Sequence, residues 1–223
     1  MKPKRFKSPA IPLGISGILI THHLKKGRFA KQELLNIFNQ HLPTQADLED
    51  EPELSIEDQL SKEISAVKNQ SDFTFVSLDI ECLLFCKTCM DPIELVTSIF
   101  KSNQKQTRYT NRLIPIQKTC SANLTNILES LQKLISTYLS NAEPSTFAIC
   151  LKIRNNSKLD KDTLITKIAE LMDSKIFSVE LKNPRFSIIV EVVNLVACLS
   201  IIENYNEYKK FNLESLVTTI HEE

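Results

Sequence analysis

Glycine is scarce in this chain of 223 residues: there are three, and none follows Gly27. Several phosphate and cofactor sites depend on glycine, because a backbone without side chains can turn sharply and close around the ligand. The P-loop, the Rossmann fingerprint, the nucleophile elbow and the kinase glycine-rich loop need it. The KH clamp and the usual ribonucleoprotein motif of the RNA-recognition domain need it too. None of these sites can be built after residue 27.

Tryptophan is absent, and no apolar run reaches the length of a membrane span. Residues 1–7 are basic, but no apolar segment of signal-peptide type follows them. Six cysteines without such a signal indicate free thiols in a reducing compartment. We therefore expect an intracellular protein, in the nucleus, the nucleolus or the cytoplasm, with no membrane partner.

The net charge is zero, but charges of one sign are grouped along the chain. Residues 1–40 hold eight Lys or Arg against one Asp or Glu, and residues 101–158 hold nine against two. Residues 41–82 hold two against eleven. Basic blocks are typical of proteins that bind a polyanion, because each cation at a phosphate releases counterions. The alternative is that these charges are spread over solvated faces, since blocks in sequence need not form patches in space.

The hydrophobic patterns predict a mixed α/β (α+β) fold. Pro115 indicates an edge position or the end of its strand, because proline cannot donate to a central ladder. The two strands near the C-terminus are apolar on both faces, so we expect them to be central and covered by helices. Strands are expected at 15–21, 73–77, 82–86, 112–117, 146–154, 186–193 and 195–202, and helices at 28–42, at 55–67, from 91, from a Ser121 cap, from 160 and at 205–218.

The chain is expected to divide into two units between flanking segments. The first unit is a β-α-β-β arrangement of ferredoxin-like size, and the second begins where Asp91 and Glu94 form a capping box around Pro92. The expected parts are a basic tail at 1–14, the first unit at 15–90 with an acidic linker at 43–53, the second unit at 91–204, and a C-terminal helix or tail at 205–223.

The cysteines invite a metal or redox interpretation. Cys86 and Cys89 form a C-x-x-C pair with Cys82 nearby, but tetrahedral zinc needs a fourth ligand and usually a second close pair. A redox pair of thioredoxin type would open a helix, whereas here Asp91 and Pro92 open the next helix. No histidine stands in a recognisable nucleophile arrangement. We expect neither a metal site nor a catalytic residue in this chain.

The most informative stretch is 152–158, at the end of a predicted strand and before a helix. Cations and amides gathered in one loop suit phosphate and sugar contacts, with the amides left for base edges. The alternative is an Asx turn that merely ends the strand. If the strand at 112–117 is a neighbour, one face carries six cations. The candidate residues in this basic block are Arg108, Arg112, Lys118, Lys152, Arg154, Asn155, Asn156 and Lys158.

Several runs occur in an order that resembles a known family. They are Gly17–Thr21 (GILIT), Arg112–Cys120 (RLIPIQKTC), Thr146–Ser157 (TFAICLKIRNNS), Leu181–Ser200 (LKNPRFSIIVEVVNLVACLS) and Tyr208–Leu213 (YKKFNL). Together they resemble the THUMP-domain accessory proteins of tRNA acetyltransferases, the Tan1/THUMP-domain-containing adaptor family. The resemblance covers nearly the whole chain and implies an N-terminal ferredoxin-like domain followed by a THUMP domain.

The resemblance also implies a function. Such proteins are non-catalytic adaptors that bind serine and leucine tRNAs and present them to a large RNA cytidine acetyltransferase, which forms N4-acetylcytidine in the D arm. That partner uses acetyl-CoA and ATP, so no cofactor is expected in this chain. Matching motifs carry RNA binding over to Arg112, Lys118, Lys152, Arg154, Asn155 and Asn156, with Pro184 and Arg185 as a weaker addition. The chain lacks the methyltransferase or sulfur-transfer module of other THUMP proteins.

Two other functions remain open from the sequence. One is a small enzyme that uses a thiol such as Cys89 or Cys120, which requires a lowered thiol pKa. The other is a protein–protein interaction module that docks through the acidic segment 47–58 without binding RNA.

Overall fold

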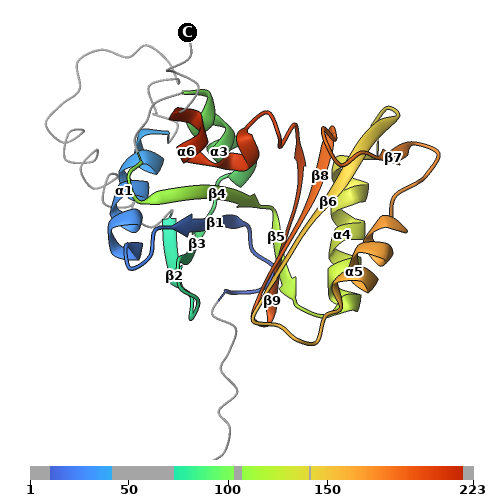
Figure 1. Ribbon diagram of the computed structural model, residues 1–223, viewed down its shortest axis with the longest axis horizontal. Coiled ribbons are helices and arrows are strands. Elements are labelled where there is room, and N and C mark those ends of the chain that lie inside the picture. The colour runs from blue at the N-terminus through green and yellow to red at the C-terminus, as the bar shows by residue number, and fades with distance from the viewer. Residues whose placement is uncertain (1–10, 42–72, 103–106, 141, 218–223) are drawn as a thin grey trace, which may run out of the picture.

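The computed structural model describes residues 11–41, 73–102, 107–140 and 142–217, which form two sheets with helices packed against them (Figure 1). The first unit holds β1 (Gly17–His22), α1 (Gly27–Gln40), β2 (Phe73–Ser77), β3 (Leu83–Thr88), α3 (Pro92–Lys101) and β4 (Thr110–Ile116). The second holds β5 (Lys118–Ser121), α4 (Leu124–Tyr138), β6 (Ser145–Arg154), α5 (Lys161–Ala169), β7 (Phe177–Val179), β8 (Phe186–Val193) and β9 (Val196–Glu203), followed by η2 (Lys209–Phe211) and α6 (Leu213–Val217). The acidic linker at 43–53, the segment 47–58 and the helix expected at 55–67 lie outside the described residues.

The first sheet has the strand order β2-β3-β1-β4, and every neighbouring pair is antiparallel. With its two helices it makes the β-α-β-β-α-β arrangement of a ferredoxin-like fold. Helix α1 is amphipathic and turns one face to the sheet, because its apolar residues recur at helical spacing. Its buried residues are Ala30, Leu34, Ile37 and Phe38. The ferredoxin-like part of the predicted fold is confirmed.

Helix α3 packs on this first sheet, and β4 is its edge strand. The predicted cap is present, since the Asp91 carboxylate accepts hydrogen bonds from the N–H groups of Ile93 and Glu94. The apolar face of α3 joins the core of the first unit, and β4 pairs with β1 at the sheet edge, where Pro115 was expected. The boundary that we placed at residue 91 therefore falls inside the first sheet, because a capping box marks the start of a helix and not of a domain.

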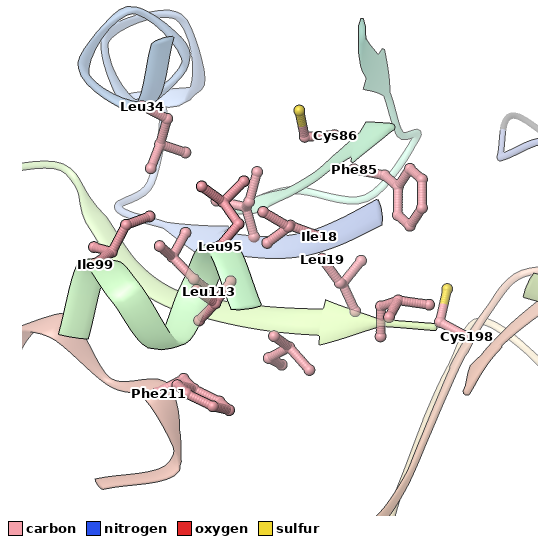
Figure 2. Close-up of a cluster of buried hydrophobic side chains, with 14 of the residues drawn as sticks. Ile18, Leu19, Leu34, Phe85, Cys86, Leu95, Ile99, Leu113, Cys198 and Phe211 are labelled. Atoms are coloured by element: carbon pink, nitrogen blue, oxygen red, sulfur yellow. The ribbon is translucent and has the colours of Figure 1, made fainter. Parts of the chain in front are cut away.

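The second sheet has the order β5-β9-β8-β6-β7, with β6 parallel to β7 and β8. Helices α4 and α5 cover one face (Figure 1). Strands β8 and β9 are buried except for Glu203, and the face away from α4 and α5 joins the core of the first unit. Figure 2 shows Cys198 of β9 beside the end of β4. Helix α4 is capped by Asn123, which accepts from the Asn126 N–H (2.8 Å), and not by Ser121.

The segment before β1 is part of the fold. Gly14 N–H donates to the Thr119 carbonyl (2.8 Å), and Thr119 N–H donates to the Ile15 carbonyl (3.0 Å), so residues 14 and 15 run beside β5. The Thr119 hydroxyl donates to the Pro12 carbonyl (2.8 Å), and Ile11 is buried. Residues 11–14, which we expected in a basic tail, are thus held against β5 by hydrogen bonds to Thr119, with Ile11 buried and residues 12–14 exposed. Residues 1–10 lie outside the described part.

The segment after β9 returns to the first unit. We expected a helix at 205–218, but only Leu213–Val217 is α-helical within the described residues. Lys209, Lys210 and Phe211 have φ values of 51°, 57° and 50°, which lie in the left-handed region and exclude a right-handed helix there. The Phe211 ring lies 5.2 Å from the Phe100 ring of α3, and Figure 2 shows it beneath that helix. The two units therefore share a core.

Candidate nucleic-acid interface

Strand β6 ends in a charged cluster. Its alternate residues Phe147, Ile149, Leu151 and Ile153 face α4 and α5, as the sequence pattern predicts. Lys152 and Arg154 lie on the opposite face, where Lys152 is paired in register with Glu191 of β8. Lys152 Nζ lies 3.8 Å from Glu191 Oε1, and Arg154 Nη1 donates to Glu191 Oε2. This rim of the second sheet carries two cations around one carboxylate.

The three side chains differ in exposure. That of Glu191 is 5% exposed, that of Arg154 is 25% exposed and that of Lys152 is 53% exposed. A buried carboxylate needs a charged partner, because removal from water penalises its ionised form. Arg154 supplies the direct hydrogen bond, so one positive charge, that of Lys152, remains largely available to a ligand.

The loop after β6 is an Asx turn, which is the structural alternative that the sequence left open. Asn156 Oδ1 accepts from the N–H groups of Lys158 (3.0 Å) and Leu159 (3.2 Å), and its Nδ2 donates to the Asn194 carbonyl (2.8 Å). The Asn156 amide therefore holds the loop in place. Asn155 has a φ of 52° and, like Lys158, is exposed, so these two side chains are accessible from solvent.

Arg112 of β4 and Lys210 of η2 belong to the same region between the units. Burial raises the pKa of the Tyr205 hydroxyl, nearby Cys150 raises it further, and the charge of Arg112 lowers it. Burial also raises the pKa of the Cys150 thiol, while the charges of Lys210 and Lys152 lower it. Arg112 thus acts on Tyr205, Lys152 and Lys210 act on Cys150, and Cys150 acts on Tyr205. We call this set the basic rim: Arg112, Lys152, Arg154 and Lys210.

Strands β4 and β6 are not neighbours, so the predicted face of six cations does not form. Lys118 starts β5, which is separated from β6 by β9 and β8. It lies in the register row of Leu199 and Val190, whose side chains face α4 and α5. Lys152 lies on the opposite face of that sheet. Arg108 lies just before β4, at the end of the strand away from β5. Sequence separation alone could not decide this pairing.

Arg185 lies at the opposite end of the second sheet. It precedes β8, whose first residues pair with the first residues of the parallel strand β6, while Arg154 ends β6. Its Nε donates to Glu203 Oε1 (2.9 Å), and its guanidinium lies 5.3 Å from the centre of the Phe186 ring. The structure does not bring it to the basic rim.

One residue of the basic rim, Lys210, and the carboxylate beside that rim, Glu191, were missed in the sequence. Glu191 is the single carboxylate within the apolar strand 186–193, and a lone charge in a fully buried strand signals a partner cation. Lys210 belongs to the run YKKFNL, but no local pattern indicated that this run turns back toward β6.

Three of the six thiols, those of Cys86, Cys120 and Cys198, are buried. Burial raises the pKa of Cys86 to about 12, and it raises that of Cys120 although the Ser130 side chain and Lys118 lower it. All six cysteines are free, and Cys89 is the exposed one. Across the described ranges no three His, Cys, Asp or Glu side chains are grouped so that they could hold a metal ion. In the same ranges no helix has the length and apolar character that a membrane span requires.

Comparison with known proteins shows which family shares this architecture. The family model described as THUMP domain matches residues 121–202, which is nearly the whole second sheet with α4 and α5. An uncharacterised protein of Schizosaccharomyces pombe is 33% identical over 95% of this chain and 79% of its own length. THUMP domain-containing protein 1 of Bos taurus is 29% identical over 92% of this chain and 64% of its own length.

Two further likenesses cover most of the chain. The protein named tRNA acetyltransferase TAN1 of Saccharomyces cerevisiae is 27% identical over 96% of this chain and 89% of its own length. The crystal structure of PH1313 from Pyrococcus horikoshii has a TM-score of 0.52 at 13% identity, over 86% of this chain and 56% of that one, which is a likeness of fold.

A ferredoxin-like unit followed by the matched second sheet defines a THUMP-domain protein. The chain belongs to the family of THUMP domain-containing proteins whose members include TAN1 and THUMP domain-containing protein 1. It spans just under two thirds of the bovine relative.

Proposed function

We propose that this protein is a tRNA-binding adaptor that presents serine and leucine tRNAs to a large RNA cytidine acetyltransferase for N4-acetylcytidine formation in the D arm. Membership of the family, with a relative named as a tRNA acetyltransferase, supports a role in tRNA modification. The observation that carries the RNA-binding part is the basic rim, where exposed Lys152 stands beside Arg154 and Lys210 at the boundary of the units.

The proposed contacts are to the phosphate backbone. The positive charge comes from Arg112, Lys152 and Lys210. The Asn156 side-chain amide is used in the turn, so these cations are not joined by an ordered set of free amides. Phosphate contacts position a nucleic acid but do not read its sequence. Choice among tRNAs would then rest on shape and on contacts elsewhere on the protein.

The adaptor proposal includes the absence of catalysis by this chain alone. The thiol-enzyme alternative needs a lowered thiol pKa, and the pKa of one of its two candidates, Cys120, is raised by burial. Acetyl-CoA and ATP would be used by the partner enzyme. The interaction-module alternative rests on segment 47–58, which lies outside the described residues.

The test is tRNA binding at two salt concentrations, with a DNA duplex of similar length as the control. We expect salt-sensitive binding that prefers tRNA, because counterion release from phosphates drives it. The purified chain with tRNA, acetyl-CoA and ATP should form no N4-acetylcytidine until the acetyltransferase is added. Equal binding to both nucleic acids, or product formation by the chain alone, would refute the adaptor role.

A further inference from the structure

Two aromatic rings meet on the surface of the first unit. Phe29 of α1 and Tyr109, which directly precedes β4, have ring centres 5.3 Å apart at an interplanar angle of 38°. Phe29 is 53% exposed, although the other large apolar side chains of α1 are mostly buried. In Figure 1, α1 and the start of β4 lie on the side of the first unit far from α4 and α5.

Cations surround this ring pair. Lys26 Nζ lies 5.3 Å from the centre of the Phe29 ring and 5.7 Å from that of Tyr109, and Arg108 Cζ lies 5.7 Å from Tyr109. Lys25 and Arg28 are exposed in the same turn. We call Lys26, Phe29, Arg108 and Tyr109 the ring platform.

Hydrogen bonds to Tyr109 and Thr110 hold the ring platform in place. Glu33 of α1 accepts hydrogen bonds from the N–H of Tyr109 (3.2 Å) and from the hydroxyl of Thr110 (2.9 Å). The Tyr109 carbonyl accepts from the His23 N–H (3.0 Å). Glu33 is thus hydrogen-bonded to residues 108–110, and Glu214 pairs with His23 (3.1 Å). The four cations Lys25, Lys26, Arg28 and Arg108 outnumber these two carboxylates.

We propose that the ring platform is a stacking site for an unpaired nucleobase of the bound RNA, a proposal that rests on the RNA-binding function proposed above. Proteins recognise unpaired bases by stacking them on aromatic faces while cations contact the adjoining phosphates. The platform offers both, from the start of α1 and the residues just before β4. A protein partner would also fit exposed rings, but the four cations Lys25, Lys26, Arg28 and Arg108 complement a polyanion.

The absence of tryptophan from the chain makes a direct test possible. Phe29→Trp introduces a single tryptophan at the platform, and Tyr138→Trp introduces one at a residue that is 50% exposed on α4 of the other unit. Tryptophan fluorescence is then followed while tRNA or a single-stranded oligoribonucleotide is added. We expect quenching in the Phe29→Trp protein and little in the Tyr138→Trp control. Equal quenching in both, or none at the platform, would overturn the proposal.

Affinity gives the second readout. The double variant Phe29→Leu/Tyr109→Leu should bind tRNA roughly 5- to 100-fold more weakly, from the stacking energy of one base. The slope of log affinity against log salt should stay unchanged, because no phosphate contact is lost. Phe29→Tyr/Tyr109→Phe keeps both rings and should bind like the parent protein. Thermal unfolding of each variant verifies that it is folded.

The outcomes separate this proposal from the function on which it rests. If the leucine variant binds tRNA normally while Lys152→Ala weakens binding, the adaptor function stands and the stacking site falls. If the parent protein does not bind tRNA at all, both fall. If the leucine variant loses only the acetyltransferase, the ring platform is a protein contact and the stacking proposal is wrong.

Discussion

Arg154 of β6 donates a hydrogen bond to the carboxylate of Glu191 in β8, a residue that is only 4% exposed. The pair forms because β6 and β8 run parallel in register and place Lys152 opposite Glu191, two residues before Arg154. Arg154 therefore has a structural role whether or not RNA is bound. Lys152, more than half exposed, is the better probe of RNA contact at this rim.

Removing Arg154 should destabilise the fold. In Arg154→Ala, Glu191 loses its hydrogen-bonded cation and keeps only Lys152 at 3.8 Å. We expect the free energy of unfolding to fall by about 2–4 kcal/mol, somewhat below the range for a fully buried pair because Arg154 is a quarter exposed. Urea denaturation measures this change. Arg154→Ala/Glu191→Gln should recover part of the loss, and a double variant as unstable as the single one would show that the ion pair is not its cause.

Lys152→Ala should weaken tRNA binding without unfolding the protein. The slope of log affinity against log salt should fall in magnitude by about one, the value for one lost phosphate contact. Lys175→Ala, which removes an exposed lysine between α5 and β7, is the matched control and should leave the slope unchanged. Filter binding across a salt series gives both slopes. Identical slopes for the two variants would place the RNA contact elsewhere.

Gly17→Ala should be strongly destabilising. A Cβ atom at Gly17 would lie 2.4 Å from the Cys86 carbonyl oxygen and 2.7 Å from Cζ of Phe85, so β1 would have to move away from β3. We expect a loss of about 2–3 kcal/mol from this overpacking. At Gly14 no atom lies within 4 Å of the added Cβ, but φ is +75°, so Gly14→Ala should cost only about 1 kcal/mol of backbone strain. Denaturation midpoints of the two variants compare the two costs.

The thiols should differ widely in reactivity. Cys89 is exposed, whereas Cys86 and Cys198 are buried, and burial raises the pKa of each of these two. The thiolate is the reactive form, so alkylation at pH 8 should modify Cys89 first and leave Cys86 and Cys198 protected until the protein unfolds. Peptide mass spectrometry identifies the order. Cys89→Ser should remove the fast phase of alkylation and leave tRNA binding intact. Loss of the protein's function in that variant would favour the alternative that it is a thiol-dependent enzyme.

The buried thiols should also make the protein less stable in alkali. The pKa of Cys86 is about 12 in the folded state against 9.0 as its ordinary value, so the folded state holds the proton more tightly. The contribution of this pKa shift to the free energy of unfolding is fully present below pH 9. It is lost as pH rises from 9 toward 12, by up to about 1.4 kcal/mol per pH unit. Urea denaturation at pH 8 and pH 10 measures the decline, which should be shallower in Cys86→Ala. An equal decline in both proteins would contradict the assignment.

Local patterns in the sequence determined much of the fold. The alternation of Phe147, Ile149, Leu151 and Ile153 predicted which face of β6 is buried, because side chains of a strand point alternately to its two faces. Asp91 predicted the start of α3 through its hydrogen bonds to the next backbone N–H groups. The scarcity of glycine excluded the usual nucleotide loops after residue 27. Each of these inferences depends on contacts within a few residues.

Only the tertiary structure decided which segments meet. It placed β4 beside β1 and not beside β6, it paired Arg154 with Glu191, and it brought Tyr109 against Phe29. Such pairings depend on which apolar faces cover one another after the chain has returned over a long distance. The spacing of apolar residues along a strand or helix shows which face is apolar, but not which distant part of the chain will cover that face. The candidate residues Arg112, Lys152 and Arg154 were therefore predictable from the sequence, while Lys210, Phe29 and the grouping into a basic rim and a ring platform were not.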